Sequence, residues 1–357
     1  MLGTPSYAAD MPRRWRLFPI LFVVVFVVAG CIGGANQRGS ARPLVSLRGL
    51  TMGSHWSVKY TVPDSVHDRI GVQRALQSVL DRLESQMSTW RDDSELSRFN
   101  HSQSTEWFAV PIETARVVAE AQRISKLTEG AFDVTVLPLL KLWGFGSRTQ
   151  PQRVPAPVEV AAARVSVGWK KLEVRMAPPA LRKMVGGLQV DLSGIAPGFA
   201  ADELGAWLEG RGIANFLVDV GGELRARGTD LRGDPWRVGI ERPANSERVV
   251  DAVVSLNNVA LATSGDYRNF FEQAGKRYSH IFDPRTGAPS QSGVASVSVV
   301  HPSAMTADAL ATALVVMGME SGLELAQREG WAVRYVERRD GELLKLMTPA
   351  FRQMLAR

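Results

Sequence analysis

The chain has 357 residues, which is enough for one large domain or two modest ones. Its composition, 45% hydrophobic and 22% charged, is that of an ordinary globular protein. The formal net charge is +6, but the basic residues are scattered and no run of Lys or Arg exceeds two residues. We therefore expect no nucleic-acid partner, because a small molecule that bears a pyrophosphate suits this charge equally well.

The N-terminus has the pattern of a targeting segment. Three arginines precede the apolar run 17–29, which is broken by Pro19 and is short for a membrane span. The run ends in VAGC, which is similar to a bacterial lipobox and puts Cys31 at the cleavage point. The alternative is a chance cysteine behind a plain membrane anchor. We expect a lipoprotein signal peptide over 1–30 and a lipidated Cys31, followed by a lipid-anchored tether over 31–43.

This targeting pattern predicts a protein anchored by lipid to the periplasmic side of a bacterial inner membrane. Cys31 is the single cysteine of the chain, so the mature protein would have no free thiol. Such a chain suits an oxidising compartment. It also excludes cysteine catalysis and structural Cys–zinc sites.

The first half of the folded part begins with strands and continues with helices. Two strands joined by a turn at 51–53 are predicted within 45–62. Apolar residues at helical spacing predict a helix over 70–87, and a second helix is expected over 111–128. The remaining segments are a polar loop with a short helix (88–100), an apolar stretch (132–143) and a Gly/Pro-rich connection (144–157). Neither side of that connection has enough strands to close a sheet alone, so we expect one domain over 44–357.

The second half mixes strands and helices without a regular order. A short strand is predicted over 188–192, then the sequence SGIAPG and a helix over 197–209, whose first turn tolerates Pro197. Another helix is predicted over 305–317. Further strands are expected at 216–220, 236–240, 249–256, 259–263, 277–282 and 294–300, and near Val333 and Leu344. This order predicts an α+β fold with mixed sheets and flanking helices, not a doubly wound sheet.

The predicted helix over 305–317 contains a polar pair. Asp308 and Thr312 are four residues apart and therefore lie on one face. The opposite face, which a helix would bury, contains Leu310, Leu314 and Met317. A carboxylate and a hydroxyl together suit Mg²⁺ better than zinc or copper. Spacing alone favours a simpler role, in which the acid stabilises the helix N-terminus and the threonine bonds back to the preceding turn.

Eight blocks of sequence, in this order, resemble one family. No GxGxxG motif and no P-loop occurs, and a single glycine turn after a strand is weak evidence for a nucleotide site. The ordered blocks are much more specific, and together they resemble the ApbE family of FAD:protein FMN transferases over nearly the whole mature chain. The blocks are MG (52–53), MSTWRDDSELSRFN (87–100), TEGAFDVTVLPLLKLWGFG (128–146), VDLSGIAPGFAADEL (190–204), FLVDVGGELRARG (216–228), ATSGDYRNFF (262–271), RYSHIFDPRTGAP (277–289) and TADALATALVVMG (306–318).

The resemblance implies a fold and an activity. It implies a single large domain of the ApbE type, T-fold-like, with a cleft for FAD. Such enzymes take FAD and Mg²⁺, cleave the pyrophosphate, join FMN to a Thr or Ser of a target protein as a phosphoester, and release AMP. Their acceptors include flavinylated subunits of membrane redox complexes, with a short Asp…Ser/Thr-Gly-Ala-Thr-like motif. Two alternatives remain open: a Mg²⁺-dependent FAD pyrophosphatase that uses water, and a non-catalytic flavin-binding lipoprotein.

The resemblance also implies binding residues, motif by motif. Asp308, Thr312 and the backbone carbonyl of Gly194 correspond to the metal ligands. A tryptophan at a FAD position can stack on a planar ring, although such aromatic side chains taken alone are as often core residues. The positions that correspond to FAD contacts are Met52, Trp90, Ala131, Phe132, Asp133, Asp191, Pro197 and Phe282.

Two catalytic candidates lie in the SHIFDPRTG stretch. His280 is the candidate general base for the acceptor hydroxyl, because the ordinary pKa of imidazole lies near working pH. Asp283 has three open roles: it orients His280, contacts a second Mg²⁺, or simply forms an Asp-Pro turn.

One position departs from the family pattern. The family commonly has Lys where this chain has Pro197, which offers neither a positive charge nor an N–H donor. We expect either weaker FAD binding or replacement of that contact by another basic residue such as Arg285.

Overall fold

The computed structural model describes residues 43–61, 68–146, 151–243, 249–267 and 269–356. The predicted signal peptide, Cys31 and nearly all of the predicted tether lie outside the described residues. Among the helices of the described ranges, none is both long enough and apolar enough to cross a membrane.

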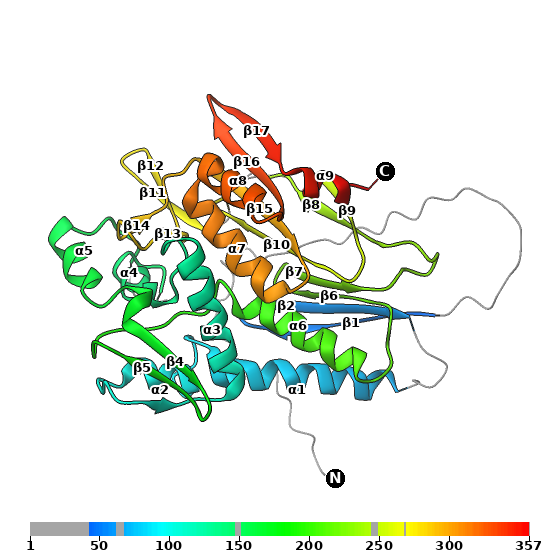
Figure 1. Cartoon of the computed structure of the whole chain (residues 1–357), viewed down its shortest axis with the longest axis horizontal. Helices are drawn as coiled ribbons and strands as arrows, with labels where there is room; N and C mark the ends of the chain where they lie inside the picture. Colours follow the sequence, from blue (N-terminus) through cyan, green and yellow to red (C-terminus); the bar gives the residue numbers. More distant parts are fainter. Residues whose placement is uncertain (1–42, 62–67, 147–150, 244–248, 268, 357) are drawn as a thin grey trace, which may run out of the picture.

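The central element is an eight-stranded sheet (Figure 1). Each strand pairs with its neighbours in antiparallel register, and the sheet combines strands from both ends of the chain. The α+β class with flanking helices is thus confirmed, with antiparallel pairing. The strand order is β1 (Leu44–Thr51), β2 (Ser54–Thr61), β6 (Phe216–Val220), β7 (Glu223–Arg227), β10 (Ala260–Gly265), β15 (Val294–His301), β16 (Ala332–Arg339) and β17 (Glu342–Met347).

Two helices pack side by side on one face of this sheet (Figure 1). Helix α6 (Ala196–Glu209) lies against β6 and β7, and α7 (Ala304–Met317) lies against β10 and β15. The prediction of one buried face for α7 was too narrow, because α3 (Ile112–Leu127), α6 and α8 (Met319–Arg328) cover its other sides. Asp308 is consequently only 5% exposed, although it lies opposite the apolar face.

The other face of the sheet has a separate apolar cluster. Side chains alternate across a strand, so Phe216 and Val218 face α6 while Leu217 points to the opposite side. The hairpin of β8 (Trp236–Glu241) and β9 (Val250–Leu256) and the short helix α9 (Pro349–Met354) supply the rest of this second cluster.

A smaller region packs beside the end of the large sheet (Figure 1). A third cluster within it contains Trp143 and Phe282. Helix α1 (Arg69–Met87) lies outside this region, along the edge of the large sheet. The helices of the smaller region are α2 (Glu95–His101), α3, η2 (Val134–Val136), α4 (Leu137–Leu142), α5 (Pro157–Arg164) and η3 (Trp169–Lys171). Its strands are β3 (Phe108–Ala109), β4 (Leu172–Met176), β5 (Pro179–Lys183), β11 (Phe270–Gln273), β12 (Lys276–Ser279), β13 (Phe282–Asp283) and β14 (Ala288–Pro289).

Helix α1 runs along the edge strand β1 and covers its outer carbonyl groups. Three side chains spaced one turn apart on α1 donate hydrogen bonds to alternate carbonyls of β1. The pairs are Arg69 with Ser46 (3.0 Å), Gln73 with Arg48 (3.1 Å) and Gln77 with Leu50 (3.1 Å). The backbone groups that an edge strand normally leaves unpaired are therefore partly satisfied within the chain.

The predicted strand over 188–192 is wrong. This segment is buried but belongs to no sheet, because side chains and a distant loop take its backbone hydrogen bonds. The amide of Asn100 pairs with both the N–H (2.7 Å) and the carbonyl (2.8 Å) of Val190. Lys183 donates to the carbonyl of Leu188 (3.0 Å), and the N–H of Asp191 donates to the carbonyl of Val134 (2.7 Å).

The predicted strand over 277–282 is two short strands. At His280 and Ile281 the chain changes its partner strand from β11 to β14, which ends β12 and begins β13. The other predicted elements occur within a few residues of their expected bounds.

Candidate functional site

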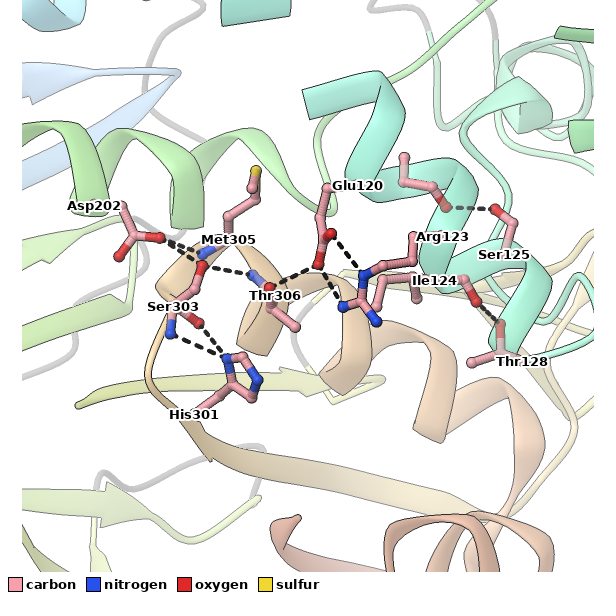
Figure 2. A network of polar contacts seen from close by, with 11 residues as sticks. Glu120, Arg123, Ile124, Ser125, Thr128, Asp202, His301, Ser303, Met305 and Thr306 are labelled. Carbon is pink, nitrogen blue, oxygen red and sulfur yellow. Dashed lines mark hydrogen bonds and ion pairs between the residues drawn. The ribbon is translucent and has the colours of Figure 1, made fainter. Parts of the chain in front are cut away.

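The first turn of α7 is fixed by a carboxylate from α6 (Figure 2). Asp202 accepts three hydrogen bonds at 2.7–3.0 Å, from the hydroxyl of Ser303 and from the backbone N–H groups of Ala304 and Met305. The first N–H groups of a helix have no partner within the helix. A negative charge beside them also interacts favourably with the positive end of the helix dipole. Asp202 therefore binds α6 to the start of α7.

A second carboxylate binds the same turn to α3 (Figure 2). Glu120 accepts a hydrogen bond from the hydroxyl of Thr306 (2.7 Å) and a two-point contact from Arg123 (2.7 and 2.8 Å). Helix α7 is thus held from two sides before the chain reaches Asp308, one turn further on.

Gly198 brings α6 and α7 into close contact. Its N–H donates to Oδ2 of Asp308 (3.0 Å). A Cβ atom at this position would lie 2.3 Å from the carbonyl oxygen of Ala304 and 2.8 Å from Cβ of Asp308. No side chain fits there, so the close approach that orients Asp308 depends on glycine.

We predict that Gly198→Ala lowers the free energy of unfolding by about 3 kcal/mol, because the new methyl group collides with backbone. The orientation of Asp308 should change as well, since α7 must move away from α6. Gly210→Ala is the matched control, because it lies at the end of α6 in helical conformation and its Cβ would meet nothing closer than 3.5 Å. Urea unfolding of both variants measures the difference, and equal stabilities would contradict the packing argument.

The structure brings the three predicted metal ligands to one place. Asp308 and Thr312 lie on successive turns of α7, and Oγ1 of Thr312 lies 3.0 Å from the hydroxyl of Ser264 on β10. A Cβ atom at Gly194 would lie 3.5 Å from Oγ1 of Thr312 and 3.4 Å from the ring of Phe132. The backbone of Gly194 therefore lies next to the Thr312 hydroxyl.

The charge around Asp308 suits a cation. Burial raises the pKa of Asp308 to about 7 and that of Asp219 to about 7. Burial, together with the nearby carboxylates of Asp308 and Asp219, raises the pKa of Glu223 well above its ordinary value. Three carboxyl groups thus lie where their ionisation is costly, and a divalent cation would offset that cost.

The donor set fits Mg²⁺ in particular. Among the described residues, no three or more His, Cys, Asp or Glu side chains are grouped so that they could hold a metal. Ligation here would use one carboxylate and neutral oxygens, whereas zinc favours nitrogen and sulfur ligands. Protein Mg²⁺ sites commonly have one or two carboxylates, completed by water and substrate phosphates.

A cavity of about 310 Å³ has two lining residues, Asn100 and Lys141, that hydrogen-bond to Val190 and Gln189 in the segment before Gly194. Its size is at the low end for ligand pockets, so it suits one ring system with its neighbouring groups rather than a whole dinucleotide. Trp90, predicted to contact FAD, lines it and is 55% exposed. The other lining residues are Thr89, Asp92, Ser97, Asn100, His101, Leu137, Lys141 and Gly146.

The two predicted aspartates have different surroundings. The buried carboxylate of Asp133 accepts from the N–H (2.8 Å) and hydroxyl (2.6 Å) of Thr135 and from the N–H of Trp169 (2.7 Å), so it holds local structure together. Asp191 accepts from the N–H of Ser193 (2.9 Å), and its charge interacts with that of Lys141. FAD contact stays a prediction for both residues.

The apolar FAD candidates divide between core and turn. Ala131 and Phe132 are buried in the main core. The ring of Phe132 also lies beside Gly194. Phe282 is buried edge-to-face against Trp143, with ring centres 5.9 Å apart. Met52 has a positive φ of 50° in the turn between β1 and β2.

The Met52 turn lies at the same end of the sheet as the carboxyl groups. The N–H of Gly221 donates to the carbonyl of His55 (3.0 Å), which joins this turn to the loop between Asp219 and Glu223. Pro197 precedes Gly198 in the first turn of α6, close to Asp308.

His280 and Asp283 are not paired with each other. The ring Nδ1 of His280 lies 3.1 Å from the carbonyl oxygen of Asn269, while Asp283 forms a two-point ion pair with Arg285 (2.8 and 2.9 Å). The N–H of Gly287 also donates to the carbonyl of Asp283, as in a tight turn. The contacts of Asp283 match the turn role that the sequence left open, and the partner that orients His280 is Asn269.

Sequence reasoning missed several residues of this region. Asp219 and Glu223 could have been found from the sequence, since both are acidic residues within the quoted block FLVDVGGELRARG. Ser264 lies within another quoted block, ATSGDYRNFF. Asn100 and Lys141 also lie within quoted blocks, but their roles depend on contacts with residues far along the chain.

Comparison with known proteins shows the family of the chain. The ApbE family model matches residues 52–335. The chain is 42% identical to the FAD:protein FMN transferase of Vibrio cholerae, over 97% of this chain and 100% of that protein, and 40% identical to that of Salmonella typhimurium, over 94% and 96%.

Two solved structures are also similar. The flavin transferase ApbE from Vibrio cholerae superposes with a TM-score of 0.82 at 42% identity, covering 88% of this chain and 100% of that one. The apo flavinyl transferase ApbE from Pseudomonas stutzeri gives 0.82 at 36% identity, covering 89% and 98%. The chain belongs to the ApbE family.

Proposed function

We propose that this chain transfers FMN from FAD to a protein acceptor, with a Mg²⁺ ion held by Asp308, Thr312 and the carbonyl of Gly194. The relatives at about 40% identity are FAD:protein FMN transferases. The observation behind the metal assignment is the convergence of these three groups at the contact between α6 and α7. A bound Mg²⁺ would neutralise charge on the pyrophosphate oxygens, which is a main source of catalysis in phosphoryl transfer.

His280 is proposed to remove the proton from the acceptor hydroxyl, that of a Thr or Ser. A carbonyl oxygen can only accept, so the contact with Asn269 places the imidazole proton on Nδ1 and leaves Nε2 as the basic nitrogen. Burial lowers the pKa of His280 below 6.5, so the ring is neutral at pH 7.

In the proposed reaction, one bond to phosphorus forms and one bond to phosphorus breaks. The acceptor oxygen forms a bond to the phosphorus of the FMN half, and the bond from that phosphorus to the bridging oxygen breaks. AMP leaves with the bridging oxygen, and the acceptor proton passes to Nε2 of His280.

We predict that His280→Ala lowers kcat by about 10²–10⁴-fold, the usual contribution of a general base, while FAD affinity stays within about twofold. In the wild type, the acid limb of kcat/KM should have a lower apparent pKa than that of an ordinary imidazole, because burial lowers the pKa of His280. The pH dependence of His280→Ala should lack this limb. A limb that persists in the variant would assign the titration to another group.

The transfer itself is tested by mass spectrometry of an acceptor. The full chain in detergent is incubated with FAD, Mg²⁺ and a candidate acceptor, and the acceptor mass should rise by one FMN. AMP release without an adduct would instead indicate an FAD pyrophosphatase. Bound FAD that is never turned over would indicate a flavin-binding lipoprotein.

We also propose that the protein is a lipoprotein, anchored through Cys31 at the periplasmic face of the inner membrane. Subunits of membrane redox complexes are then its acceptors. The support is the lipobox-like sequence before Cys31. Cys31→Ser should release the protein from the membrane fraction, and a variant that stays there would contradict lipid anchoring.

A further inference from the structure

The resemblance to the ApbE family implies a lysine at the position of Pro197, which offers no positive charge. Pro197 lies in the first turn of α6, beside Gly198 and the carboxylate of Asp308. The sequence suggested Arg285 as the basic residue that replaces this lysine, but Arg285 forms a two-point ion pair with Asp283. A different basic residue must therefore offset the phosphate charge if FAD is to bind well.

Lys141 is placed to do this. It lies near the end of α4, is half-buried and lines the 310 Å³ cavity together with Trp90. Its aliphatic stem is packed against the chain at Gly146, where a Cβ atom would lie 2.9 Å from Cγ of Lys141. The stem is thus held, and the hydrogen bond that the structure gives Nζ is to the neutral amide oxygen of Gln189 (2.8 Å).

Lys141 is partly desolvated by the protein. Burial lowers its pKa, and the charge of Asp191 acts in the opposite direction. Asp92 also lines the cavity but is exposed to solvent. A desolvated cation beside a cavity favours an anionic ligand group, and the pyrophosphate is the anionic part of FAD.

One short segment joins this cavity to the proposed metal site. Phe132 packs beside Gly194, and nine residues later Lys141 lines the cavity. Asp191, three residues before Gly194, interacts with the charge of Lys141. Lys141 also donates to Gln189, so it links the cavity wall to the segment that leads to Gly194.

We infer that Lys141 binds the pyrophosphate of FAD and provides the positive charge that Pro197 cannot. This inference rests on the proposed function. It assigns to Lys141 a binding role that differs from the stacking role of Trp90, so the two are separable by the choice of ligand.

The test measures the affinities of the full chain in detergent for FAD, ADP and riboflavin, which lacks phosphate. Lys141→Met should weaken FAD and ADP binding by about tenfold or more and leave riboflavin within about twofold. Lys141→Arg should retain most of the FAD affinity. Lys126→Met, on the exposed surface of α3, is the control for the loss of one positive charge.

A second variant tests the replacement directly. Lys141→Met combined with Pro197→Lys should recover most of the FAD affinity, since it returns a cation to the same ligand from α6. Unchanged FAD affinity in Lys141→Met, an equal loss of riboflavin binding, or no recovery in the double variant would each overturn the inference. Wild-type FMN transfer is measured separately: a chain that binds phosphate through Lys141 but transfers no FMN contradicts only the proposed function.

Discussion

Asp308→Asn is expected to abolish FMN transfer and, at the same time, to stabilise the protein without metal. The transfer rate should fall at least about a thousandfold, because a ligand that contributes several kcal/mol of charge stabilisation is lost. Stability should rise because the buried carboxyl group resists ionisation: its folded pKa is about 7 and its ordinary value is 3.8. Asn keeps the shape and removes the charge.

The sign of the pH dependence follows from these two pKa values. Between about pH 4 and pH 7 the unfolded chain has Asp308 ionised while the folded chain holds its proton. The folded state therefore binds more protons, and the free energy of unfolding of the wild type falls as pH rises through this range. Asp308→Asn should lose this part of the decline.

Thermal unfolding with and without Mg²⁺ checks both parts. The wild type should gain stability from Mg²⁺ at pH 8, whereas Asp308→Asn should not. Asp234→Asn, on an exposed loop, is the control and should behave like the wild type. If Asp308→Asn keeps its Mg²⁺-dependent stabilisation, the metal lies elsewhere.

Lys183→Met is expected to be among the most destabilising single substitutions in the chain. Lys183 is only 1% exposed, and its ammonium group donates to the carbonyls of Phe99 (2.9 Å), Ser102 (2.8 Å) and Leu188 (3.0 Å). Removing it leaves two buried acceptors and one part-buried acceptor without this donor, so the free energy of unfolding should fall by about 3 kcal/mol or more.

The same substitution should weaken FAD binding. Lys183 joins the C-terminal end of α2, which forms part of the cavity wall, to the segment that leads to Asp191. Urea unfolding and FAD titration of Lys183→Met measure both effects, with Lys126→Met as the matched control. A loss of stability no greater than that of Lys126→Met would show that water replaces the three donations.

The sequence predicted those parts of the fold that local pattern determines. The hairpin of β1 and β2 follows from its turn at Met52, and α6 follows from Pro197 at its start and the apolar spacing behind it. Helix α7 was predicted in length, but not its complete burial, because burial of Asp308 depends on which elements surround the helix.

Local pattern failed where tertiary contacts provide the hydrogen bonds. Val190 has a strand-like sequence, yet its backbone pairs with Asn100, 90 positions earlier in the chain. The role of Lys183 also depends on a distant contact, because its acceptor carbonyl on Phe99 is 84 positions away. The candidate site was named only through the resemblance to a family, since spacing alone favoured a structural role for Asp308 and Thr312.

The cover that α1 places over β1 limits how another protein can dock. Strand addition extends a sheet by offering new hydrogen bonds to the free carbonyls and N–H groups of an edge strand. At β1, the carbonyls of Ser46, Arg48 and Leu50 are already taken. An acceptor therefore gains little by aligning its backbone there.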